Sequence, residues 1–179
     1  VAGVGLGGGA TGGGPVALPM AGERRQVEMM ATDASAEALE VAGRNARGHG
    51  IGNVRFLHGD WLSPLGDQAV GLIVSNPPYI EFDDPHLGRG DLRFEPLTAL
   101  VSGRDGLDDI RRIIDDARRH LQPSGWLLFE HGWQQGDAVR ALLRNAGYAE
   151  AFTAQDLEHR DRVSGGRWPA ARVTPDDPR

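Results

Sequence analysis

Short apolar runs alternate along the chain with stretches in which apolar residues recur at helical spacing. Val70 to Ser75 is a continuous apolar run bounded by turn residues, typical of a strand buried on both faces of a parallel sheet, and it predicts the central strand. Shorter runs predict further strands at 27–32, 53–58 and 126–130. Helical spacing and stop signals predict helices at 16–21, 35–46, 107–121 and 139–146.

Strands that alternate with helices in this way predict a doubly wound α/β sheet. After the last helix, residues 148–154 and 162–168 have the pattern of a terminal antiparallel strand pair. Residues 80–104 show little periodicity and predict a long loop, a length usually associated with function or disorder. Ligands of doubly wound sheets bind beyond the carboxyl ends of the strands, so chemistry is expected there.

Composition limits the possible classes of protein. The chain has 179 residues, 40% of them hydrophobic and 25% charged, which is consistent with one globular domain over 1–173 and a disordered tail at 174–179. The net charge of -6 disfavours tight, stable nucleic acid binding, and the absence of cysteine excludes disulfides and thiolate ligands. No apolar run approaches the roughly 20 residues that cross a bilayer, so a cytoplasmic monomer without a membrane partner is expected.

The tetrapeptide Asn76-Pro77-Pro78-Tyr79 follows the predicted central strand directly. Proline lacks an N–H and fixes φ, so the carbonyls of Asn76 and Pro77 can be held outward as two acceptors, which suit one NH2 group. Tyr79 would offer a flat wall for a planar amide or base. The alternative is an ordinary turn that ends the strand.

The sequence resembles the HemK-type N5-glutamine methyltransferases, which modify the Gly-Gly-Gln glutamine of peptide chain release factors. The segments that carry the resemblance are Asp33 to Asn45, Gly59 to Trp61, Val74 to Tyr79, Asp84 to Leu87, Arg93 to Leu100 and Glu130 to Gly136. It implies a mostly parallel, seven-stranded, Rossmann-like S-adenosylmethionine-dependent methyltransferase fold. It also implies S-adenosylmethionine as cofactor and release factors as protein substrates.

The resemblance also implies roles for individual residues. Asp33 should accept hydrogen bonds from the ribose hydroxyls of the cofactor, the alternative being a helix N-cap. Trp61, with Asp60 nearby, should flank the adenine ring, the alternative being a core aromatic residue. Asn76 should bind the substrate amide and lie close to the methionine part of the cofactor, and Glu95 belongs to the substrate-binding set.

The glycine-rich start departs from the family pattern. Ala10, Thr11, Gly12, Gly13 and Gly14 align with its cofactor loop, while Gly8 replaces an acidic residue. Glycines at 7–9 also weaken the expected first strand, by on the order of 0.5 to 1 kcal/mol each. Genuine divergence and an error in the first thirty or so residues both remain open. The helical N-terminal domain of the family is expected to be absent from this sequence.

Two other functional hypotheses remain. An N6-adenine methyltransferase acting on DNA or RNA would share the tetrapeptide and stack a flipped base on Tyr79. A non-catalytic remnant would keep the sheet without binding cofactor. The six histidines show no metal-ligand spacing, so no metal is predicted, and His131 is interpreted as a structural hydrogen-bonding residue.

Overall fold

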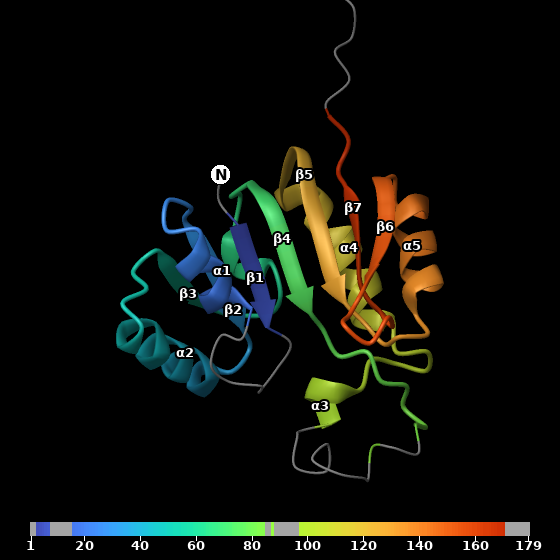
Figure 1. Cartoon of the computed structure of the whole chain (residues 1–179), viewed down its shortest axis with the longest axis horizontal. Helices are drawn as coiled ribbons and strands as arrows, with labels where there is room; N and C mark the ends of the chain where they lie inside the picture. Colours follow the sequence, from blue (N-terminus) through green and yellow to red (C-terminus); the bar gives the residue numbers. More distant parts are fainter. Residues whose placement is uncertain (1–2, 8–15, 85–86, 88–96, 171–179) are drawn as a thin grey trace, which may run out of the picture.

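A seven-stranded sheet with helices packed against it forms the structure (Figure 1). The computed structural model describes residues 3–7, 16–84, 87 and 97–170. The strands are β1 (Gly3–Gly7), β2 (Met29–Asp33), β3 (Val54–His58), β4 (Val70–Asn76), β5 (Leu121–Glu130), β6 (Ala149–Gln155) and β7 (Asp161–Arg167). The helices are α1 (Ala17–Glu23), α2 (Ala36–Gly48), α3 (Leu97–Leu100), α4 (Asp108–His120) and α5 (Gly136–Asn145), with a 3-10 turn at Ser63–Leu65.

The strand order is β3-β2-β1-β4-β5-β7-β6. Strands β1 to β5 pair in parallel, and β7 runs antiparallel to both β5 and β6. The predicted mostly parallel α/β sheet with a C-terminal antiparallel pair is therefore confirmed. Because the chain first builds outward from β1 to β3 and then returns to place β4 on the other side of β1, the sheet reverses its order between β1 and β4. That reversal is where doubly wound sheets bind ligands.

Two local features differ from the sequence-based expectations, and one prediction lies outside the described residues. Strand β1 occupies Gly3–Gly7 and pairs on both sides, so its glycines do not prevent a central strand from forming. The predicted loop at 80–104 contains the short helix α3 and a parallel bridge between Ile80 and Val101. Residues 174–179 lie outside the described part of the chain.

Strand β5 begins at Leu121, five residues earlier than predicted. Proline and glycine at 123–125 do not end the strand, because the chain bulges there and then resumes pairing with β4. The bulge is held by the residue that follows β7: Ser124 N donates to the Trp168 carbonyl at 3.0 Å, and Trp168 N donates to the Gly125 carbonyl at 2.7 Å. Ser124 has a φ of 67°, so a left-handed residue makes the turn.

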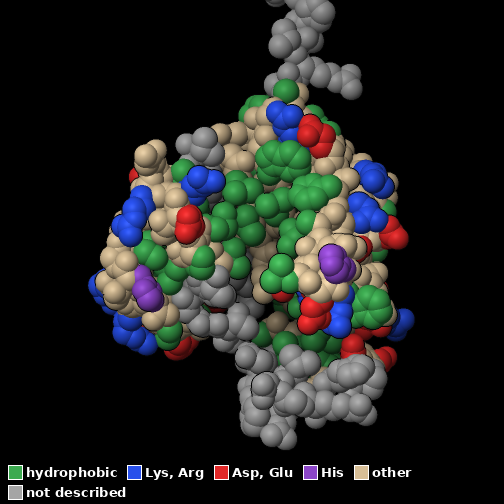
Figure 2. Space-filling model, in the orientation of Figure 1, with side chains coloured by type: hydrophobic (Ala, Val, Ile, Leu, Met, Phe, Trp, Pro, Cys, Tyr) green, Lys and Arg blue, Asp and Glu red, His purple; other side chains and the backbone are tan. Residues whose placement is uncertain are grey.

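Residues that alternate along β4 and β5 divide between the two faces of the sheet. Ile73, Leu127 and Phe129 are fully buried in the hydrophobic core that also contains apolar residues of α4 and α5. On the other face, Trp126 is only half-buried and meets Phe152 edge-on, with ring centroids 5.9 Å apart. Figure 2 shows hydrophobic side chains gathered over the central strands on the face turned toward the viewer.

No helix among the described residues is both long and apolar enough to span a membrane.

The packing under α4 and α5 predicts which apolar truncations destabilise the fold. Leu127 has no exposed surface, so Leu127→Ala should lower the free energy of unfolding by about 2–5 kcal/mol through lost contacts and a cavity. Leu157 is fully exposed, so Leu157→Ala should change it by less than about 0.5 kcal/mol. Urea unfolding of both variants measures this, and equal effects would show that the core is assigned wrongly.

Candidate functional site

The register of the central strands places two predicted site residues at one edge of the sheet. Leu6 of β1 is level with Thr32 of β2 and with Ser75 of β4. The next residues on the flanking strands are Asp33 and Asn76, so these two end level with each other on either side of β1. Neighbouring strands are about 4.8 Å apart, which separates the two backbones by about 10 Å. The predicted cofactor and acceptor residues are thus brought to the switch point of the sheet.

The turn after β4 is fixed at both ends. Asn76 is the last residue of β4 and is level with Gly7 of β1. Beyond the turn, Ile80 N donates to the Leu100 carbonyl at 2.9 Å, and Ser102 N donates to the Ile80 carbonyl at 3.0 Å. Pro77 and Pro78 between these anchors are buried. The turn is therefore a rigid platform at the carboxyl edge.

Polar groups of this turn are available for a ligand. Within the part of the chain that the structure describes, neither the side-chain amide of Asn76 nor the carbonyl of Pro77 makes a hydrogen bond. Asn76 is half-buried at the rim, so its amide can be reached from solvent. Unpaired acceptors on rigid backbone suit a ligand with N–H donors, and the binding role of Asn76 and Pro77 stays a prediction.

Tyr79 closes the turn with a half-buried ring. Burial raises the pKa of its phenol, the negative charge of Glu130 raises it further, and Arg162 opposes both effects. The phenol therefore stays neutral at physiological pH. It can offer an aromatic face, but it cannot act as a phenolate base.

Asp33 is held in place at the end of β2 without capping a helix. Its Oδ1 accepts a hydrogen bond from Ser35 N at 2.8 Å, whereas Ser35 is the N-cap of α2 and its hydroxyl accepts from Ala38 N at 3.1 Å. The N-cap interpretation of Asp33 is therefore wrong. Burial raises the pKa of the Asp33 carboxyl above the ordinary value of 3.8, while the Ser35 N–H and the charge of His58 act against this.

Trp61 and Asp60 follow β3 and point to different partners. Trp61 is only 9% exposed and belongs to the hydrophobic core, so its ring has the environment that the core interpretation predicts. Its carbonyl accepts a hydrogen bond from Thr32 Oγ1 at 2.7 Å, which ties the residue to β2. Asp60 is half-exposed and forms an ion pair with Arg112 of α4, a partner that sequence reasoning did not identify.

Several predicted residues lie outside the described residues. They are Ala10, Thr11, Gly12, Gly13 and Gly14 of the glycine loop, and Glu95 of the predicted substrate-binding set.

The structure adds neighbours of Tyr79 that the sequence did not indicate: Glu130, Arg162 and Gln135. Glu130 and Arg162 act on its phenol through their charges. Gln135 Nε2 donates to the Tyr79 carbonyl at 3.0 Å. Glu130 and Gln135 both lie in the segment Glu130 to Gly136 that supports the family resemblance. The resemblance of that segment to the family indicated that it matters, but nothing in the sequence showed that it would contact Tyr79.

His131 is a structural residue, as predicted. It is fully buried, with Nδ1 2.8 Å from the Gly132 carbonyl and Nε2 2.8 Å from Ser164 Oγ. A carbonyl can only accept, so Nδ1 carries the hydrogen and Nε2 accepts from Ser164. Burial lowers the pKa of the imidazole, which keeps it neutral. Among the described residues, no three histidine or carboxylate side chains are grouped to hold a metal ion.

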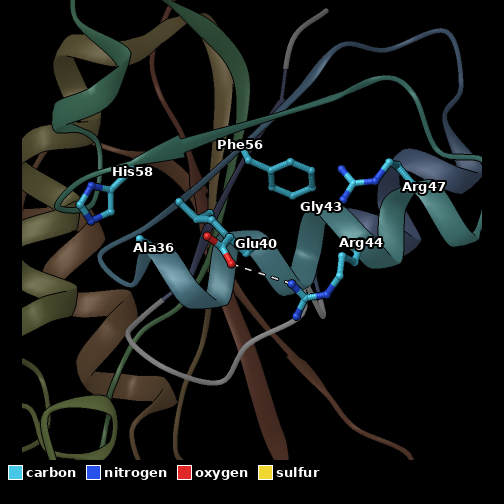
Figure 3. Close-up of a pocket in the computed structure, with 8 residues that line it drawn as sticks. Ala36, Glu40, Gly43, Arg44, Arg47, Phe56 and His58 are labelled. Carbon is cyan, nitrogen blue, oxygen red and sulfur yellow. Dashed lines mark ion pairs between the residues drawn. The ribbon is translucent and has the colours of Figure 1, made fainter.

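A groove of about 560 Å³ lies between α2 and β3 (Figure 3). Phe56 forms part of its wall, and Arg44 pairs with Glu40 at 3.9 Å across the helix surface. His58 lies at the carboxyl end of β3, level with Asp33. No residue of the Asn76 turn lines this groove, so it is not the acceptor half of the site.

Comparisons with known proteins agree with the fold described above. The family model described as the methyltransferase small domain matches residues 4–87. Among solved structures, a methyltransferase from Pyrococcus furiosus has a TM-score of 0.68 at 17% identity, covering 94% of this chain and 75% of its own. A 16S rRNA N2 G1207 methyltransferase from T. Thermophilus, in complex with AdoMet and guanosine, has a TM-score of 0.62 at 16% identity, covering 93% and 37%. These likenesses define the fold as that of S-adenosylmethionine-dependent methyltransferases.

Sequence comparison is more specific. The release factor glutamine methyltransferase of Xylella fastidiosa (strain Temecula1) is 55% identical over 159 residues, 89% of this chain and 58% of that protein. The Escherichia coli (strain K12) protein of the same name is 48% identical over 158 residues, 88% and 57%. By sequence, the chain is similar to release factor glutamine methyltransferases over most of its own length, and it spans a little under three fifths of the length of these relatives.

The two different roles of Asp33 and Ser35 predict opposite effects on stability. Ser35→Ala removes the cap of α2 and should lower the free energy of unfolding by about 1 kcal/mol. Asp33→Asn keeps an acceptor for Ser35 N and removes a partly desolvated charge, so at pH 7 it should be at least as stable as the wild type.

The pH dependence follows from the raised pKa of Asp33. The folded chain binds a proton more readily than the unfolded chain, so ionisation costs stability as pH rises through the folded pKa. The gain in the free energy of unfolding of Asp33→Asn over the wild type should be complete above the folded pKa and should shrink as pH falls toward 3.8. Urea unfolding of both proteins at a series of pH values from about 3.8 to 7 measures this difference in stability. A large loss of stability in Asp33→Asn at pH 7 would show that the carboxylate is structural.

Proposed function

We propose that this chain transfers a methyl group from S-adenosylmethionine to the side-chain amide nitrogen (N5) of the glutamine in the Gly-Gly-Gln motif of peptide chain release factors. The observation that carries the proposal is that the Asn76 amide and the Pro77 carbonyl, on a rigid turn level with Asp33, have no hydrogen-bond partner among the described residues. The names of relatives that are up to 55% identical support the choice of substrate.

The cofactor half of the proposed site fits the residues present. Asp33 ends β2 with its carboxyl held by Ser35 N, which leaves further oxygen lone pairs for ribose hydroxyls. Asp60 and Trp61 are proposed for the adenine end, with only the small exposed part of Trp61 in contact. The loop 10–14 and the backbone of Asn76 complete the proposed set. When bound, S-adenosylmethionine supplies an electrophilic methyl group.

The acceptor half works through orientation. An amide nitrogen is a poor nucleophile because its lone pair is conjugated with the carbonyl. The oxygens of Asn76 and Pro77 would accept its two hydrogens, which turns electron density along the line of attack, while Tyr79 supports the planar group. Pro78 keeps the turn rigid, and Glu95 belongs to the proposed substrate contacts. Neutral oxygens also suit a nitrogen that becomes positive, so no strong base is needed.

Charge favours a protein substrate over a nucleic acid. With a net charge of -6, the chain lacks the positive field that supplies most of the affinity for a duplex. A monomer that acts in the cytoplasm, where release factors work, is part of the same proposal.

The proposal predicts the destination of a labelled methyl group. The chain should transfer label from S-adenosylmethionine to a release factor and should not label a variant in which the motif glutamine is replaced. Scintillation counting and mass spectrometry of the modified peptide measure the transfer. DNA and RNA serve as competing acceptors in parallel reactions.

Each result of this experiment distinguishes a function. Label on DNA or RNA but not on the release factor would favour an N6-adenine methyltransferase. No transfer together with no calorimetric binding of S-adenosylmethionine would favour the non-catalytic remnant.

The acceptor geometry makes a separate prediction for Asn76. Asn76→Ala should lower kcat by on the order of 100-fold, because one of two oriented oxygens is lost. Far-ultraviolet circular dichroism should show an unchanged fold. Asn145→Ala, at an exposed position of α5, is the matched control and should keep wild-type activity. Full activity of Asn76→Ala would show that the turn is only structural.

A further inference from the structure

We propose that Gln135 is a positioning residue for methyl transfer, which holds the Asn76–Tyr79 turn in its working geometry through the carbonyl of Tyr79. This inference rests on the proposed function. It assigns a role to a side chain that contacts neither of the two acceptor groups, the Asn76 amide and the Pro77 carbonyl.

Three hydrogen bonds fix the Gln135 side chain. Its Oε1 accepts from Gly132 N at 2.9 Å, while its Nε2 donates to the carbonyl of Tyr79 at 3.0 Å and to that of Asp105 at 3.2 Å. Carbonyls can only accept and an N–H can only donate, so the amide has one possible orientation. Gln135 therefore joins three segments: the exit of the turn, the residues before α4, and the start of α5.

The turn needs an external donor because of its own composition. Pro77 and Pro78 have no N–H, so the middle of the turn cannot hold itself by backbone hydrogen bonds. Its entry is held by β1, and Ile80 beyond its exit is held by Leu100 and Ser102. Between these anchors, the Gln135 amide is the donor that fixes the Tyr79 carbonyl.

Close packing leaves no room for a side chain beside this hydrogen bond. A Cβ added to Gly106 would lie 2.3 Å from the Tyr79 oxygen and 2.7 Å from Gln135 Nε2. Gly106 also has a φ of 70°, in the left-handed region that favours glycine. A side chain at position 106 would thus collide with both partners of the hydrogen bond between Gln135 and the Tyr79 carbonyl.

Gln135 itself is on a rigid support. It is the N-cap residue of α5, and its backbone N donates to the Gly132 carbonyl at 2.9 Å. Side chains that begin at the end of a packed helix position a site more accurately than those on a free loop. Displacement of an acceptor by about 1 Å can cost roughly 100-fold in rate, so loss of this support should be visible in kcat.

The test is Gln135→Glu in the whole chain. The carboxylate can still accept from Gly132 N, but it cannot donate to the carbonyls of Tyr79 and Asp105. Transfer to the release factor should fall roughly 10- to 100-fold in kcat. The calorimetric Kd for S-adenosylmethionine should change less than about threefold, because Asp33 lies beyond β1 from the turn. Gln134→Glu is the matched control, with the same change of charge at the adjacent exposed residue, and should keep wild-type kcat.

A pH series separates positioning from general destabilisation. When the introduced carboxyl is protonated, it regains one O–H donor for the Tyr79 carbonyl. The ratio of the Gln135→Glu rate to the wild-type rate should therefore rise as pH falls from about 8 to about 5. If Gln135→Glu does not fold, Gln135→Met gives the kcat comparison without a buried charge, and its rate relative to the wild type should be low at every pH.

Wild-type kcat in the folded Gln135→Glu or Gln135→Met variant would overturn the inference while leaving the proposed function intact. A pH-independent ratio for Gln135→Glu would assign Gln135 to the fold and would also overturn the inference. No transfer by the wild-type chain would overturn the proposed function, and the inference with it.

Discussion

Parallel pairing of β1 with both β2 and β4 is the constraint on which the site depends. Hydrogen bonds on either side of β1 set the register, and that register brings Asp33 and Asn76 level at one edge. A shift of one residue would turn every side chain of a strand to the other face. Strand β1 has glycine at 3, 5 and 7 and still pairs on both sides.

Asp33 and the Asn76 turn, which lie at the same edge of the sheet, are supported in different ways. Asp33 is held locally, by an N–H two residues away, and its carboxyl is partly desolvated. The Asn76 turn is held by distant segments, because its prolines cannot donate hydrogen bonds. Ionisation of Asp33 is disfavoured by burial, which is typical of groups retained for binding at some cost to stability.

Neutrality characterises the acceptor side. Burial and Glu130 keep the Tyr79 phenol protonated, and burial keeps His131 uncharged within a closed hydrogen-bonded group. Among the described residues Asn76 to Tyr79, none has a side chain that acts as a strong base. A platform of oriented, uncharged oxygens is consistent with chemistry in which geometry, rather than proton abstraction, provides the acceleration.

The sequence by itself determined the α/β sheet, its antiparallel end and the position of Asn76-Pro77-Pro78-Tyr79 after a buried strand, because hydrophobic period and proline chemistry are local. Tertiary structure decided what depends on distant segments. The Asp60–Arg112 ion pair and the hydrogen bond from Gln135 to Tyr79 each join residues about 50 positions apart in the sequence. The burial of the Trp61 ring likewise depends on packing that no local sequence pattern specifies. The sequence predicted a helix that begins at Ser35 but left Asp33 open as its cap, since either side chain can accept the bond and only backbone geometry selects Ser35.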